Sequence, residues 1–154
     1  MNYGQLALWS FAAGAFIPVV GILNSGLART VSGPAPATLI LISVAWIGMI
    51  IAILVSRTAL PAPAVLGGVR PYLYGGGLII AFYIFSATTL APRFGVGNFI
   101  LFALTAQLVA ASVIDQFGLF GAPLMPIAPL RALGVAVMVG GLILTQIRPS
   151  GLRV

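Results

Sequence analysis

Polar, charged and aromatic side chains interrupt long apolar runs at only a few positions of this 154-residue chain. The side chains that could do chemistry there are Asn24, Trp46, Tyr83, Gln107 and Asp115. Amides form hydrogen bonds with a ligand or with a neighbouring helix. Aromatic faces attract cations, and a carboxylate within a membrane segment can hold a proton or a cation. These residue types therefore indicate binding chemistry rather than bond-making chemistry.

Each of these five residues also has a structural interpretation, which the sequence leaves open. Gln107 could join two helices through an interhelical hydrogen bond, and Asn24 could cap a helix near the membrane interface. Trp46 and Tyr83 could pack against helices or lipid. Asp115 lies at the end of an apolar run and not at its middle. This position favours a salt bridge to an arginine or an interface contact over a proton or cation site.

Enzymatic chemistry is disfavoured by the residues that the chain lacks. It contains no histidine, cysteine or lysine and has a single acidic side chain. A carboxylate pair, a histidine-based triad and a cysteine/histidine metal site are therefore unavailable within one chain. The glycine-rich segments lie in apolar runs, which disfavours a phosphate-binding loop. We expect no enzyme activity, no metal, no cofactor and no disulfide.

The composition is that of an integral membrane protein. Hydrophobic residues make up 61% of the chain and charged residues 5%, whereas soluble domains have about 25% charged residues. The net charge of +6 comes from seven arginines scattered singly between apolar runs. Such arginines are typical of membrane flanks, so we expect no nucleic-acid partner.

Five apolar runs predict an all-α domain over residues 1–154 that crosses the bilayer five times. The expected helices are residues 5–27, 37–55, 72–90, 97–115 and 130–147. No basic residue precedes the first run, so we expect that run to remain as a membrane span. Pro18 should kink it. The proline-rich stretch 116–129 predicts an interfacial or re-entrant loop, and 91–97 predicts a turn.

The fourth run carries a narrow face of small residues around its amide. That face contains Ala103, Ala106, Gln107, Ala110, Ala111 and Ile114. Small residues let another helix approach closely within a membrane. An unpaired amide in hydrocarbon is costly. We therefore expect Gln107 to face protein or a cavity.

Arginines are almost evenly divided between the two membrane sides that five spans would define. The side of the N-terminus holds Arg57, Arg70 and Arg131, and the other side holds Arg29, Arg93, Arg148 and Arg153. The positive-inside rule then gives no clear orientation. Two interpretations stand: another feature sets the orientation, or the chain inserts both ways in a dual topology.

Five segments together resemble the YdcZ-like five-helix family of the drug/metabolite transporter superfamily. They are IPVVGILNSGLAR (17–29), YGGGL (74–78), APRFGVG (91–97), AQLVAASVIDQFG (106–118) and LRALGVAVMVGG (130–141). They follow the family's order over nearly the whole chain. Gln116 stands where family members often have histidine. The small multidrug resistance branch uses a glutamate in its first helix, and this chain has no acid there.

The resemblance implies half of an inverted-repeat transporter fold, in a multi-pass protein of the bacterial inner membrane. A second copy or a five-helix paralogue in inverted orientation would complete it. The leading hypothesis is a transporter of small organic solutes that works as an antiparallel dimer by alternating access. Asn24, Trp46, Tyr83 and Gln107 would line its cavity, because amides and aromatic rings suit an amphipathic or cationic solute. The alternative is a non-transporting subunit of a larger membrane complex.

Overall fold

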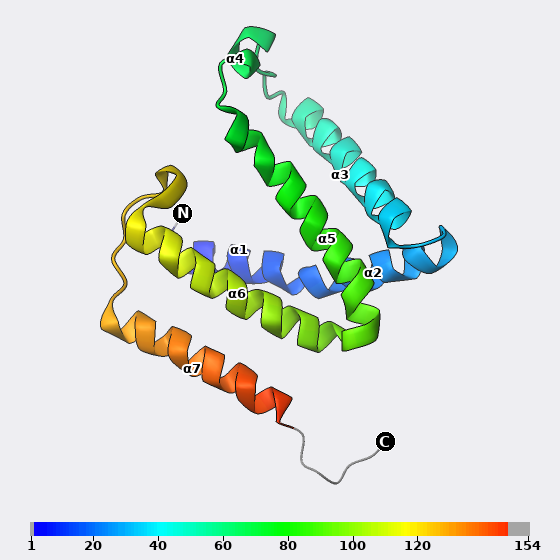
Figure 1. The fold of residues 1–154 in the computed structure, drawn as a ribbon. Coiled ribbons are helices and arrows are strands. Elements are labelled where there is room, and N and C mark those ends of the chain that lie inside the picture. Colours follow the sequence, from blue (N-terminus) through cyan, green and yellow to red (C-terminus); the bar gives the residue numbers. More distant parts are fainter. Residues whose placement is uncertain (1, 148–154) are drawn as a thin grey trace. The chain divides into compact units, whose positions relative to one another are not determined.

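The computed structural model describes residues 2–147 of the chain, and those residues form helices and connecting segments without a β-strand. The elements in order are α1 (Tyr3–Ala15), α2 (Ile17–Thr30), α3 (Pro34–Ser56), α4 (Pro63–Gly67), η1 (Pro71–Tyr74), α5 (Gly75–Phe94), α6 (Val96–Phe117), η2 (Leu119–Gly121) and α7 (Pro129–Gln146). Figure 1 shows them coloured along the chain.

The predicted all-α architecture with five membrane spans is confirmed. Five helical segments within residues 2–147 are long and apolar enough to cross a membrane. They are Tyr3–Thr30, Pro34–Ser56, Pro71–Phe94, Val96–Phe117 and Pro129–Gln146. Most extend by a few residues beyond the predicted runs, because flanking prolines and polar residues start or end the helices outside the apolar stretch. The last residues of the chain, including Arg148 and Arg153, lie outside the described part.

The first span is broken at the position where Pro18 predicts a kink. The helix α1 ends at Ala15 and α2 begins at Ile17, with Pro18 in the first turn of α2. Proline has no backbone N–H, so it cannot donate to the carbonyl of Gly14 four residues earlier. That carbonyl accepts instead from the backbone N–H of Phe16. The proline thus divides one apolar run into two helices.

The predicted turn at 91–97 is wrong in length, because both neighbouring helices extend into it. The helix α5 continues through Pro92 to Phe94, and α6 starts at Val96. Gly95 alone separates them, with a φ of 93°. A residue with a side chain rarely adopts this conformation, whereas glycine does so at little cost. A single glycine therefore makes the turn between two membrane spans.

The stretch between α3 and α5 has the proline- and glycine-rich composition of a loop, but it contains two short helices. The helix α4 spans Pro63–Gly67, and η1 leads directly into α5. The hydroxyl of Tyr74 donates to the carbonyl of Leu66 at 2.8 Å, which ties η1 to α4. Prolines start both elements, because proline is tolerated in the first turn of a helix.

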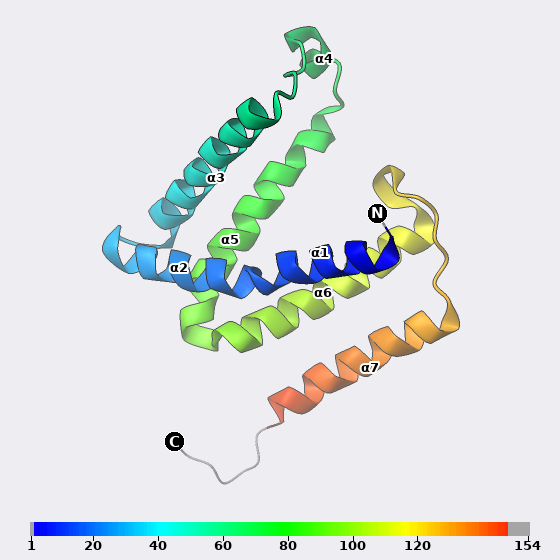
Figure 2. The same cartoon turned by 180° about the vertical axis from the view of Figure 1, so that it is seen from behind.

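The described residues form two compact units that divide after Val96, and we describe each unit separately. In the first unit, α3 and α5 lie side by side in both views (Figures 1 and 2), and α2 packs against both of them. Its buried hydrophobic residues are three alanines, Ala37, Ala87 and Ala91. They belong to the beginning of α3 and the end of α5, so the small core of this unit lies where those helix ends meet α2.

The second unit consists of α6 and α7 and the segment that joins them. The salt bridge between Asp115 and Arg131 connects the end of α6 to the beginning of α7. At the opposite ends of the two helices, Gln146 donates to Asn98 at 3.5 Å. The two helices are therefore antiparallel neighbours that are joined through side chains at both ends. No residue of α7 is buried, and Ser112 is the buried residue of α6.

Candidate functional site

Asn24 and Thr88 are the most buried polar residues of the first unit, and each is 2% exposed. Nδ2 of Asn24 donates to Oγ1 of Thr88 at 2.6 Å. The Thr88 hydroxyl in turn donates to the carbonyl of Ile84 at 2.8 Å. This chain of hydrogen bonds joins α2 to α5, helices that are distant in the sequence.

The Asn24 amide turns its nitrogen toward Thr88. The Thr88 hydroxyl accepts from Nδ2 and donates its own proton to the carbonyl of Ile84. The Asn24 Oδ1 is buried without a hydrogen-bond partner, and so is the Thr38 hydroxyl on α3. Buried polar atoms in proteins are nearly always hydrogen-bonded to protein or to ordered water.

Asn24 also lines an open groove between α2 and α3. The groove has a volume of about 380 Å³. Its walls are Val20, Leu23, Asn24 and Leu27 from α2 and Ile40, Leu41, Val44 and Ala45 from α3. Each set falls on one face of its helix, as the 3.6-residue period requires. Asn24 is thus the one polar residue in an otherwise apolar wall.

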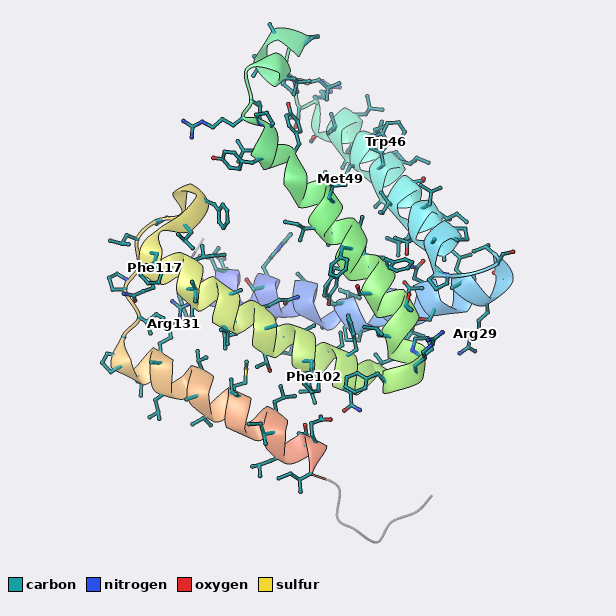
Figure 3. The ribbon with its side chains drawn as sticks, viewed as in Figure 1. Arg29, Trp46, Met49, Phe102, Phe117 and Arg131 are labelled. Carbon is teal, nitrogen blue, oxygen red and sulfur yellow. The ribbon has the colours of Figure 1, made fainter. Side chains whose placement is uncertain are left out.

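The aromatic residues predicted to line a cavity do not line this groove. Trp46 is on α3 and is 67% exposed (Figure 3), so the single chain leaves most of its ring uncovered. Tyr83 is half-buried on α5. The structure therefore brings Asn24 alone, of the predicted lining residues of the first unit, to the wall of the groove.

Gln107 lies at the middle of α6, in the second unit. Its side chain is exposed and has no hydrogen-bond partner within residues 2–147. Ala106 and Ala110 beside it are exposed as well. The second unit by itself therefore leaves the middle of this small-residue face uncovered.

Asp115 pairs with Arg131 at the end of α6. One carboxylate oxygen of Asp115 accepts from the Arg131 guanidinium at 2.8 Å, and the two side chains are 30% and 42% exposed. The loop that follows α6 folds back on the same helix end. There the Asp115 carbonyl accepts from the N–H of Met125, and the Gln116 side chain accepts from the N–H of Ile127 at 2.7 Å. Figure 3 shows Arg131 at the start of α7.

Sequence reasoning missed Thr88 and Thr38, the hydroxyl residues on the helices that pack against α2. Both lie in apolar helices, where a threonine usually bonds to the carbonyl four residues before it. That pattern gives no signal of a tertiary role. No group of three or more metal-ligating side chains occurs in the described part of the chain, and no titratable cluster accompanies the groove.

The chain was compared with known families and proteins. Residues 5–144 match the family DMT_YdcZ, described as "Putative inner membrane exporter, YdcZ". The chain belongs to this family. The predicted family is thereby confirmed, and the match covers all five spans almost completely. Neither the search of curated proteins nor the search of solved structures found a match.

Membership in the YdcZ family places the five helical spans in the inner membrane. The chain is a multi-pass inner-membrane protein of an exporter family, which is a transport class and not an enzyme class. Exposed apolar side chains along the spans are then covered by lipid or by another protein, and the flanking arginines lie near the two membrane surfaces.

Proposed function

We propose that this YdcZ-family chain exports small organic solutes as an antiparallel dimer that works by alternating access. The observation that carries the proposal is Gln107, which lies uncovered and unpaired at the middle of α6 on a face of small residues. An amide at the bilayer centre needs a polar partner. A second copy packed on this face, or the solute itself, would supply one.

The arginines of the first unit support insertion in both orientations. The C-terminal ends of α2 and α5 carry Arg29 and Arg93, and the opposite end of the unit carries Arg57 after α3 and Arg70 before η1. Two arginines thus stand at each end of this unit. Such balance is what a chain without a preferred orientation would have. Inverted halves with a binding site between them are a general design of transporters.

Within such a dimer, Asn24, Trp46, Tyr83 and Gln107 are our proposed cavity-lining residues. The groove of one chain is open, so a second copy would close it and complete the lining. Asp115 is paired with Arg131 outside the middle of the span, and we assign it a role in holding α6 to α7. The proposed solute is therefore bound by amide groups and aromatic rings.

Solute flux from liposomes tests the proposal. Purified protein is reconstituted in liposomes loaded with radiolabelled aromatic amines and aromatic alcohols, and efflux is compared with that from protein-free liposomes. We expect faster efflux of some of these probes with the native chain. A matched pair of variants, Gln107→Trp and Leu101→Trp, introduces the same side chain inside and outside the small face. Gln107→Trp should abolish the flux and Leu101→Trp should retain it. Protein-mediated flux of no probe would contradict export, and stoichiometric co-purification with one foreign protein would then favour the non-transporting subunit.

A further inference from the structure

We propose that the loop between α6 and α7 lies on the bilayer and inserts Phe120 and Leu124 into the boundary between lipid headgroups and acyl chains. The partner of this surface is lipid, not water and not another protein. The proposal does not depend on export. It chooses the interfacial alternative of the two that the sequence left open for this stretch, and it gives a role to the unusual backbone of Phe120.

The backbone of Phe120 is the observation that carries the proposal. Three residues other than glycine have a positive φ in the described part of the chain: Ser32 at 66°, Arg57 at 52° and Phe120 at 58°. This conformation costs free energy for any residue with a Cβ, and for a bulky residue it is unusual. Phe120 is the one apolar member of the three, and it is 78% exposed. In water the exposed ring would add a second cost to the strained backbone, so a lipid partner is the better explanation.

The loop that carries Phe120 is folded against the end of α6. The N–H of Met125 donates to the Asp115 carbonyl at 2.9 Å. A Cβ added to Gly118 would lie 3.2 Å from the Ala122 carbonyl oxygen, so the chain closes tightly on itself at this point. The exposed side chains of the loop therefore belong to a defined conformation.

The loop has few polar groups that need water. No charged residue lies between Asp115 and Arg131 in the sequence. The N–H of Ile127 is bonded to the side chain of Gln116 at 2.7 Å. Prolines have no N–H that needs a partner, and they occupy three positions of the loop and the start of α7: Pro123, Pro126 and Pro129. Contact with lipid is thus less costly for this loop than for an ordinary polar one.

The large side chains of the loop continue the exposed apolar surface of α6. Phe117, the last residue of α6, is exposed (Figure 3), and so are Phe120, Leu124 and Met125. Because the loop joins two membrane spans, it begins and ends at a membrane surface. Irregular backbone that is exposed to lipid does not occur in the hydrocarbon core, which excludes a deep insertion. The boundary between headgroups and acyl chains is the depth that suits apolar side chains on such a backbone.

Fluorescence depth measurements on the full chain in liposomes test the proposal. The chain has no native cysteine, so Phe120→Cys, Leu124→Cys and Ser32→Cys can each carry a single bimane label. Ser32 is the matched control, because it is also exposed, has a positive φ and lies between two membrane spans. The liposomes contain phosphatidylcholine with a doxyl quencher near the top or near the end of the acyl chain. Iodide serves as the quencher in water.

We expect the labels at positions 120 and 124 to emit at shorter wavelength than the label at position 32. The doxyl group near the top of the acyl chain should quench them more than the one near the end, and iodide should quench them less than the control. Three results would overturn the proposal. Quenching mainly by iodide would place the loop in water, and short-wavelength emission that neither lipid nor iodide quenches would mean that protein covers it. Stronger quenching from the end of the acyl chain would mean deep insertion.

Two further substitutions, each combined with Leu124→Cys, assign the insertion to Phe120. Asparagine adopts a positive φ more readily than most residues, so Phe120→Asn keeps the backbone and removes the apolar ring. It should shift the emission of the label at position 124 to longer wavelength and weaken its quenching by lipid. Phe120→Leu keeps an apolar side chain and should retain both properties. Equal behaviour of the two variants would contradict the insertion of Phe120.

Discussion

At the scale of single residues, Asn24 and Thr88 form a buried hydrogen bond. Replacing one partner should lower the free energy of unfolding by a different amount from replacing the other. Replacing Thr88 by valine removes the acceptor of a buried amide and leaves Asn24 without any partner. Replacing Asn24 by leucine leaves no orphan, because the Thr88 hydroxyl still donates to the Ile84 carbonyl. We therefore expect Thr88→Val to lower the free energy of unfolding by about 1 kcal/mol and Asn24→Leu to lower it less.

Reversible unfolding in mixed micelles, followed by circular dichroism, measures both changes. Thr89→Val serves as the control for the loss of a threonine hydroxyl from α5. A larger loss of stability in Asn24→Leu than in Thr88→Val would contradict the expectation that the unpaired amide costs more than the unpaired hydroxyl.

The salt bridge between Asp115 and Arg131 predicts a rescue by exchange. Both side chains are partly exposed, so removal of the carboxylate by Asp115→Ala should cost no more than about 1 kcal/mol of unfolding free energy. The double variant Asp115→Arg/Arg131→Asp should recover much of that loss, because the pair re-forms with its charges exchanged. It also keeps the number of arginines at this membrane side unchanged. The free energy of unfolding of both variants is measured in the same micelles. A double variant less stable than Asp115→Ala would show that the pair does not join α6 to α7.

At the scale of elements, the sequence predicts the spans well and the contacts between them poorly. Run length and hydropathy locate five spans because a bilayer imposes a minimum apolar length on each helix. Those same quantities do not specify which polar groups meet. Thr88 lies in an apolar stretch like many others, and only the packing of α5 on α2 gives it a partner. The short helix α4 was missed because its five residues are too few for a periodic pattern.

Local chemistry also explains where the helix bounds differ from prediction. Pro18 predicts a disturbance of the first span, and the structure places a complete break there. The APRFGVG segment contains proline and two glycines, which together predict a longer turn than the single residue observed. Pro92 is tolerated in the last turn of α5, so only the positive φ of Gly95 ends the helix. Composition alone does not show which of these residues determines the end.

The small face of α6 predicts a specific pattern of cross-links between two copies. Gln107 is at the middle of Val96–Phe117, and Ala103 and Ala111 lie four residues on either side of it. Two antiparallel α6 helices that meet at Gln107 would bring Ala103 of one copy beside Ala111 of the other. The two Ala103 residues would then be separated by about 12 Å, too far for a disulfide.

The chain has no native cysteine, so single cysteines can be introduced without background. Oxidation in membranes should cross-link Gln107→Cys to itself, and Ala103→Cys to a co-expressed, differently tagged Ala111→Cys. It should not cross-link Ala103→Cys to itself. Self-linking of Ala103→Cys together with failure of the mixed pair would indicate parallel helices and would contradict the antiparallel dimer.

At the scale of the whole molecule, the account depends on one chain serving as both halves of an inverted pair. The described residues bury only small hydrophobic side chains. The groove is open within the first unit, and the α6 face is uncovered within the second. Seven arginines divide three to four between the two sides of a five-span chain. Small changes in that balance should therefore shift the fraction of molecules in each orientation.

Two double variants change the number of arginines on the two membrane sides in opposite directions. Arg57→Ala/Arg70→Ala leaves most arginines on the side of the C-terminus and should place that terminus in the cytoplasm. Arg29→Ala/Arg93→Ala removes arginines from that side instead and should favour the C-terminus outside. Each variant removes two of the seven arginines, so the pair controls for the loss of charge itself.

The most direct test is the orientation of the native chain, read with two C-terminal reporters. One reporter fluoresces only in the cytoplasm, and the other is enzymatically active only outside the inner membrane. The account predicts intermediate signals from both reporters on the native chain, a rise of the fluorescent signal in Arg57→Ala/Arg70→Ala, and a rise of the enzymatic signal in Arg29→Ala/Arg93→Ala. Reporter signals that show a single orientation for the native chain, and the same orientation for both variants, would contradict the antiparallel homodimer.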